Sequence, residues 1–195
     1  VSSIEPIHVD SQFVALFEDE PKLCQHLHIP LQSGSNRILS AMNRNYSREN
    51  FVDMVDRLKN VSTHIALTTD VIVGFPGETE DDFNETLELC ERCCFSKIHV
   101  FRYSKRAGTP AAEMKQVDPD IIVERSARLR VLGEKLSAQY RSDLKGRELE
   151  VLIEREHAGQ LTATSREHIV MSFAQGAKDI AGQLMTVGNI YKVLG

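Results

Sequence analysis

Polar side chains that could bind a small molecule gather in four short segments, each at or just after the end of a predicted strand. These segments cover residues 28–37, 42–46, 69–79 and 101–111. Because the carboxyl ends of parallel strands meet at one edge of a sheet, we expect the segments to converge on one binding site. The third segment contains Gly74-Phe75-Pro76-Gly77, a turn in which glycine lets a ligand approach the backbone closely.

The elements that must position these segments alternate between strands and helices as far as about residue 115. Apolar runs predict strands over 27–31, 65–73 and 98–103. Helices are predicted over 11–17 and 36–42, and two more are predicted to begin at Ser47 and at Thr79. Asp82, three residues after Thr79, can form a capping box with it. The alternation favours an α/β fold with a parallel sheet. So few strands would leave an open edge, so we expect the native protein to extend upstream of Val1.

The rest of the chain predicts a long helix and then a small β domain. Pro119 fits the first position of a helix that runs to about Leu144. Its basic side chains, Arg125 and Arg141 among them, form either a solvated face or a ridge that contacts RNA. Five short strands follow, over 148–154, 162–165, 168–173, 183–187 and 190–193, and predict a small barrel. We therefore expect domains over 1–144 and 145–195.

Charge and composition restrict the class of protein. The net charge of −5 weighs against nucleic-acid binding, which usually needs a basic face, although a local patch could still bind. No run of eighteen apolar residues and no signal peptide is present, so we expect a cytoplasmic protein without a membrane partner.

Cysteine and histidine give little support for a metal site. Cys90 and Cys93 are spaced like half of such a site, but buried thiols that pack as small hydrophobes fit the same pattern. Four histidines lie on or near predicted strands without metal-ligand spacing: His26, His28, His64 and His99. We expect them to be structural and predict no metal site.

The four segments together resemble the second half of the radical S-adenosylmethionine (SAM) domain of methylthiotransferases. The matching stretches are HIPLQSGS, MNRNY, TTDVIVGFPGETEDDF and FRYSKRAGTPAAEM. The segment after Gly146 is similar to the terminal TRAM module of that family, an RNA-binding fold. The resemblance covers almost the whole chain and implies the second half of a partial (β/α) barrel, followed by a TRAM-like barrel. Residues 2–6 and 103–106 look most like the MtaB-like branch, which acts on threonylcarbamoyladenosine in tRNA.

The resemblance implies how SAM would be bound. Gln32 would meet the ribose, Arg44 would pair with the carboxylate, and Asp70 would accept hydrogen bonds from the ribose hydroxyls. Four further residues are implied at the same site: Ser3, Ser33, Ile72 and Gly74. The residues alone also allow a turn hydrogen bond for Gln32 and Ser33, a surface ion pair for Arg44 and a helix or turn cap for Asp70. Arg106 and Thr109 either contact the substrate or belong to a structural turn.

The family's [4Fe–4S] clusters imply a Cys-x-x-x-Cys-x-x-Cys loop, and this sequence contains none. We therefore expect the chain to be the carboxyl-terminal part of its parent protein and to be inactive alone. The parent reaction would add a methylthio group to the adenine ring of N6-threonylcarbamoyladenosine beside the anticodon. Its implied partners are tRNA, an electron donor and the missing N-terminal part.

Other functions remain open from the sequence. The chain could be a non-catalytic RNA-binding module, or part of a related enzyme that modifies a protein side chain or isopentenyl-adenosine. The salt dependence of tRNA binding would help to separate these possibilities, because contacts with phosphates make affinity fall as salt rises.

Overall fold

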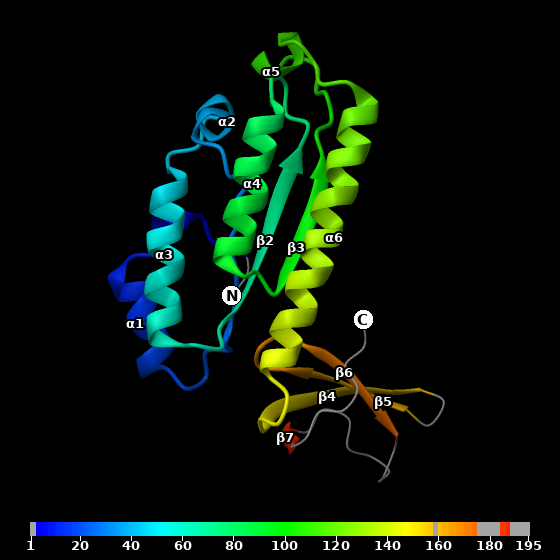
Figure 1. Cartoon of the computed structure of the whole chain (residues 1–195). Coiled ribbons are helices and arrows are strands. Elements are labelled where there is room, and N and C mark those ends of the chain that lie inside the picture. The colour runs from blue at the N-terminus through cyan, green and yellow to red at the C-terminus, as the bar shows by residue number, and fades with distance from the viewer. Residues whose placement is uncertain (1–2, 158–159, 175–183, 188–195) are drawn as a thin grey trace.

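The computed structural model describes residues 3–157, 160–174 and 184–187 (Figure 1). A three-stranded parallel sheet has the order β1–β2–β3, and a separate four-stranded antiparallel sheet follows it in the chain. The parallel strands are β1 (His26–His28), β2 (Ala66–Val73) and β3 (Lys97–Arg102). The predicted α/β class is therefore confirmed.

The first strand is shorter than predicted, because the Thr69 side chain replaces part of the backbone ladder. After Ile29 N, which donates to Thr68 O at 2.9 Å, the Leu31 amide donates to Thr69 Oγ1 at 2.9 Å, and the Thr69 hydroxyl donates to Ile29 O at 2.8 Å. A backbone bond to β2 returns only at Gln32 N, 2.8 Å from Asp70 O. The chain leaves regular strand geometry where the first polar segment begins.

Helices connect and cover the parallel strands (Figure 1). They are η1 (Pro6–His8), α1 (Ser11–Asp19), α2 (Asn36–Ala41), α3 (Arg48–Val61), α4 (Glu80–Cys93), α5 (Pro110–Glu113) and α6 (Pro119–Asp143). Ser47 forms a capping box with Asn50 at the start of α3, and Thr79 forms one with Asp82 at the start of α4. Both predicted helix starts are confirmed.

Alternation along β2 separates a buried face from a polar one. Val71 and Val73 are fully buried and belong to one core with residues of α3, α4 and α6, including Phe51, Phe83 and Leu129. Asp70 and Ile72, which alternate with the two valines, are only partly buried. Successive strand residues point to opposite faces, so the polar face remains available for binding.

The antiparallel sheet lies at the end of α6 away from α5 (Figure 1). Its strands are β4 (Leu149–His157), β5 (Gln160–Ser165), β6 (Val170–Ala174) and β7 (Leu184–Val187), in the order β6–β5–β4–β7. The strand predicted over 190–193 lies outside the described residues, so a closed barrel stays a prediction. Because α6 has 25 residues, it separates its two ends by about 37 Å.

The antiparallel sheet has its own small core, which includes Leu149, Val151 and Met171. Leu144 also packs there, so the predicted boundary between residues 144 and 145 stays a prediction. None of the helices in the described part of the chain has the length and hydropathy that a membrane span requires.

Candidate functional site

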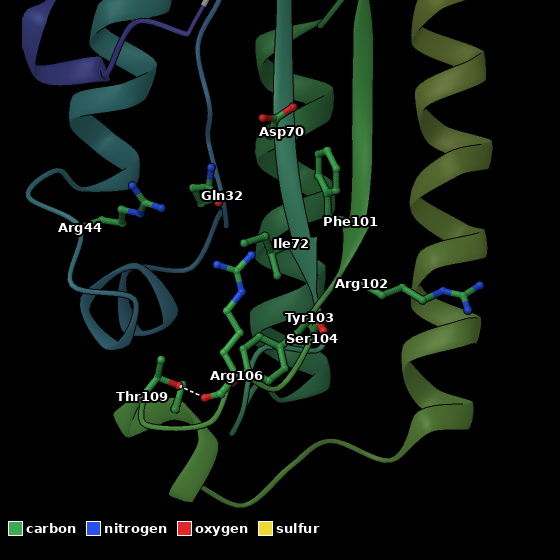
Figure 2. A pocket seen from close by; sticks show the side chains of 11 residues that line it. Gln32, Arg44, Asp70, Ile72, Phe101, Arg102, Tyr103, Ser104, Arg106 and Thr109 are labelled. Carbon is green, nitrogen blue, oxygen red and sulfur yellow. Dashed lines mark hydrogen bonds between the residues drawn. The ribbon is translucent and has the colours of Figure 1, made fainter.

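A cleft of about 630 Å³ lies at the carboxyl ends of the parallel strands (Figure 2). Six of the residues predicted from the sequence line it: Gln32, Arg44, Asp70, Ile72, Arg106 and Thr109. No individual role was predicted for the other lining residues: Phe101, Arg102, Tyr103, Ser104 and Ala111. Their position in the fourth polar segment was the available signal. The expected convergence of polar strand ends is present in the structure.

Gln32 enters the cleft through an unusual backbone turn. Its φ is 65°, a left-handed value that is uncommon for any residue except glycine. The turn is held on both sides by β2, because Gln32 N donates to Asp70 O at 2.8 Å and Ile72 N donates to Gln32 O at 2.9 Å. Such strained positions occur often at binding sites, where the surrounding structure fixes them.

Arg44 projects from the loop between α2 and α3, and that loop is anchored to the first strand. The Tyr46 hydroxyl donates to Pro30 O at 3.2 Å and to Leu31 O at 3.1 Å. Burial raises the pKa of Tyr46 to about 12, so the hydroxyl stays protonated as a donor. Arg44 Nε is buried without a hydrogen-bond partner among the described residues. A buried, unpaired guanidinium nitrogen is costly, and an anionic ligand in the cleft would satisfy it.

Asp70 lies in the middle of β2, so the alternative of a helix or turn cap does not apply. Its Oδ2 is 3.3 Å from Nε2 of His28 on β1, and its neighbour in register on β3 is His99. Burial lowers the pKa of His99, which favours the neutral ring. The carboxylate therefore lies between two imidazole rings and the cleft.

Arg106 and Thr109 form a structural turn that lines the cleft, and contact with a substrate stays a prediction. The Thr109 hydroxyl donates to Arg106 O at 2.8 Å, which closes the turn before α5. Figure 2 shows the Arg106 side chain extending from this turn toward Ile72, whereas Arg102 extends toward α6. The backbone of Arg106 is therefore structural, while its guanidinium is presented to the cleft.

Residues 3–90 match the Radical SAM superfamily. The tRNA-2-methylthio-N(6)-dimethylallyladenosine synthase of Thermoanaerobacter sp. (strain X514) is 43% identical over 186 residues, 93% of this chain and 39% of the relative. The threonylcarbamoyladenosine tRNA methylthiotransferase MtaB of Bacillus subtilis (strain 168) is 39% identical over 193 residues, 96% of this chain and 43% of the relative. The chain is a homologue of the radical SAM tRNA methylthiotransferases.

Solved structures agree with this fold. Coproporphyrinogen III oxidase HemN from Escherichia coli, a radical SAM enzyme, has a TM-score of 0.56 at 14% identity over 96% of this chain and 43% of its own. Elp3 from Methanocaldococcus infernus has a TM-score of 0.54 at 12% identity, over 99% and 64% of the two chains. At these identities the likeness concerns the fold alone. The methylthiotransferase homologue spans about two fifths of the length of the two curated relatives that it matches above.

Three residues that the resemblance implied at the SAM site do not line the cleft of the methylthiotransferase homologue. Ser33 is 1% exposed, and its hydroxyl lies 3.4 Å from the hydroxyl of Thr86 on α4. The next residue, Gly34, packs against the same helix so closely that a Cβ added to Gly34 would lie 2.5 Å from Thr86 Cα. Gly74 has a φ of +77°, and a Cβ there would collide with Ile122. Ser3 is exposed outside the cleft. Ser33 and Gly74 therefore shape the fold around the cleft, and their contact with SAM stays a prediction.

The two arginines expected on an RNA-facing ridge have different surroundings. The Arg125 side chain is 5% exposed, and its Nη1 lies 2.9 Å from Glu78 Oε2. The expectation that Arg125 faces RNA does not agree with this burial, and its role is structural. Arg141 is half-buried at the end of α6, where it donates to Ser137 Oγ at 3.0 Å.

The cysteines of the methylthiotransferase homologue do not fit an iron–sulfur cluster. Cys90 and Cys93 are completely buried in the core, and burial raises the pKa of both thiols, that of Cys93 to about 12. Cluster ligands are thiolates, which this environment disfavours. Cys24 and Cys94 are exposed, and no described cysteine belongs to a group that could hold a metal ion. The interpretation as buried structural thiols fits Cys90 and Cys93.

Proposed function

We propose that the chain forms part of a tRNA methylthiotransferase, and that its cleft holds SAM and the modified base. The observation that carries this proposal is the meeting of Gln32, Arg44 and Asp70 in one cleft, with Arg44 Nε buried and unpartnered among the described residues. The similarity to tRNA methylthiotransferases over more than nine tenths of the chain supports it. In the proposed enzyme, the cluster ligands and the electron donor come from outside these 195 residues.

The side chains of the cleft match the chemical groups of SAM. The Arg44 guanidinium would bind the carboxylate through charge-assisted hydrogen bonds, which can be bidentate. Asp70 would accept from the ribose hydroxyls, and the Gln32 amide can both donate and accept. Ile72 and Phe101 offer apolar surface for the adenine, and Phe101 is half-exposed. In this enzyme class SAM supplies the radical chemistry, and the protein supplies binding and orientation.

The cations of the cleft favour threonylcarbamoyladenosine as the modified base. Its threonylcarbamoyl group carries a carboxylate, whereas the dimethylallyl group named for other relatives is apolar. Arg106 lines the cleft, and its guanidinium has no ion-pair partner within the residues that the structure describes. We propose that Arg106 pairs with the carboxylate and that Thr109 holds the turn from which Arg106 extends. The 43% identity to a dimethylallyladenosine synthase keeps that base as the second candidate.

Analysis of tRNA from a complemented bacterium tests this function. A strain without its own methylthiotransferases would carry the full-length parent gene, which includes the coding sequence of these 195 residues, and its tRNA nucleosides would be analysed by mass spectrometry. We expect the 2-methylthio form of threonylcarbamoyladenosine, and we expect Arg44→Ala to abolish it while exposed His8→Gln leaves it unchanged. The methylthio form of the dimethylallyl base would correct the substrate, and unmodified tRNA with a stable protein would contradict the function.

The antiparallel sheet and the last turn of α6 form the proposed RNA contact outside the cleft. We propose that this TRAM-like sheet binds the tRNA body and that Arg141 contacts a phosphate. Filter binding at several salt concentrations should show affinity falling with salt, and Arg141→Ala should reduce the logarithmic slope by about 1. Exposed Lys22, which precedes β1, supplies the control Lys22→Ala. Equal slopes for Arg141→Ala and the wild-type chain would remove Arg141 from the RNA contact.

A further inference from the structure

Three side chains with metal-binding atoms lie together on adjacent strands of the parallel sheet. They are His28 on β1, Asp70 on β2 and His99 on β3, and their ligand atoms lie within 4.8 Å of one another. Asp70 is paired in register with His99, and His28 is paired with Thr68, two residues before Asp70 on the same face. The group therefore belongs to the polar face that also carries the cleft.

The geometry of His28 is that of a metal ligand held by a second residue. Its Nδ1 lies 2.9 Å from Thr68 Oγ1, while its Nε2 lies 3.3 Å from Asp70 Oδ2. Histidines that bind metals usually have their other ring nitrogen fixed by a hydrogen bond, which sets the orientation of the ring. Thr68 is 9% exposed on β2, so this support is part of the rigid sheet.

We propose that His28, Asp70 and His99 bind a divalent transition-metal ion such as Zn²⁺. Two imidazole nitrogens and one carboxylate oxygen suit Zn²⁺, whereas Mg²⁺ and Ca²⁺ prefer ligand sets made only of oxygen. In a tetrahedral site with bonds of about 2.1 Å the ligand atoms lie about 3.4 Å apart. The three ligand atoms, now within 4.8 Å of one another, would reach this spacing by small side-chain adjustments. His99 is only half-buried, which leaves room for this adjustment.

The proposed ligands are two histidines and an aspartate, without a cysteine. Three protein ligands leave a fourth coordination position open, the arrangement found in catalytic zinc sites. Because Asp70 also lines the cleft, the ion would lie beside the space that we assign to SAM and the modified base. A bound ion there could polarise an oxygen of the cleft's occupant.

Titration with Co²⁺, a coloured substitute for Zn²⁺, tests the site without SAM or tRNA. The exposed thiols would first be removed as Cys24→Ser and Cys94→Ser, because thiolates bind the same ions. We expect one Co²⁺ per chain with visible absorption bands, displaced by Zn²⁺. His28→Ala and His99→Gln should each weaken binding at least about tenfold, and Thr68→Val should weaken it by about tenfold.

The control is His8→Gln, which removes an exposed histidine in η1 and should leave the affinity unchanged. Circular dichroism would establish that each variant is folded. Unchanged affinity in folded His28→Ala and His99→Gln would overturn the proposal, as would the loss of all binding once the two thiols are removed. The Co²⁺ titration tests the metal site alone, because it uses neither SAM nor tRNA. Failure to bind Co²⁺ would therefore leave the proposed binding of SAM intact.

Discussion

Replacement of Arg125 by alanine should lower the free energy of unfolding by about 3–5 kcal/mol, because it leaves a buried carboxylate without its cation. The side chains of Arg125 and Glu78 are 5% and 2% exposed, and Arg125 Nη1 lies 2.9 Å from Glu78 Oε2. The same nitrogen donates to Glu78 O at 3.1 Å, and the guanidinium lies over the Phe83 ring, 5.6 Å from its centroid. Several contacts are therefore lost together.

The Glu78 carboxylate also connects this ion pair to the turn beside the cleft. Its Oε2 accepts from Gly74 N at 2.9 Å, so the pair joins α6 to the turn after β2. Burial raises the pKa of Glu78, opposed by the hydrogen bonds from Gly74 and Arg125 that favour the carboxylate. Without Arg125, only the hydrogen bond from Gly74 would oppose the effect of burial. The pKa of Glu78 would therefore rise further, and its carboxyl group would take up a proton more readily.

Urea denaturation followed by circular dichroism measures this effect. Arg130→Ala is the matched control, because Arg130 is exposed on the same helix, and it should change stability by less than about 0.5 kcal/mol. A double variant, Arg125→Met with Glu78→Gln, should lose less than Arg125→Ala, because it leaves no unpaired charge in the interior. A loss below about 1 kcal/mol in Arg125→Ala would show that the buried pair does not stabilise this fold.

The burial of Arg125 and its ion pair with Glu78 could not be predicted from the sequence. The helix starts at Ser47 and Thr79 were predictable because the cap and its partner stand three residues apart, so the signal is local. Glu78 is 47 residues from Arg125, and a basic residue on a polar helix is ordinarily exposed. Nothing in the spacing of the charges indicates that these two meet in the core.

The position of the cleft was predictable, because the ends of parallel strands share one edge of a sheet. The choice of Gln32, Arg44 and Asp70 within the polar segments came from the family resemblance, and all three line the cleft. Ser33 could not be separated from Gln32 in this way, because its direction depends on the approach of Gly34 to Thr86, 52 residues away. For the same reason the grouping of His28 with His99 was missed, since the two residues are neighbours only across the sheet.

The loop that carries Arg44 is fixed to the first strand through the Tyr46 hydroxyl, so Arg44 is held in position to bind a ligand. Arg44→Ala should weaken SAM binding by about 1.5–3 kcal/mol, the usual contribution of a hydrogen bond to a charged group. That range corresponds to roughly 10- to 150-fold in the dissociation constant. Arg44→Lys should recover only part of the affinity, because an ammonium group lacks the planar pair of donors that matches a carboxylate.

Titration of SAM into the chain, followed by NMR shifts of cleft residues, gives the affinity even when binding is weak. Arg48→Ala is the matched control, because Arg48 is four residues further along and pairs with Glu85 of α4 at 3.7 Å, outside the cleft. A structural role would lower the thermal stability of Arg44→Ala. A ligand-binding role would not, because Arg44 Nε has no partner among the described residues to lose. Wild-type affinity in a folded Arg44→Ala chain would therefore exclude Arg44 from the SAM site.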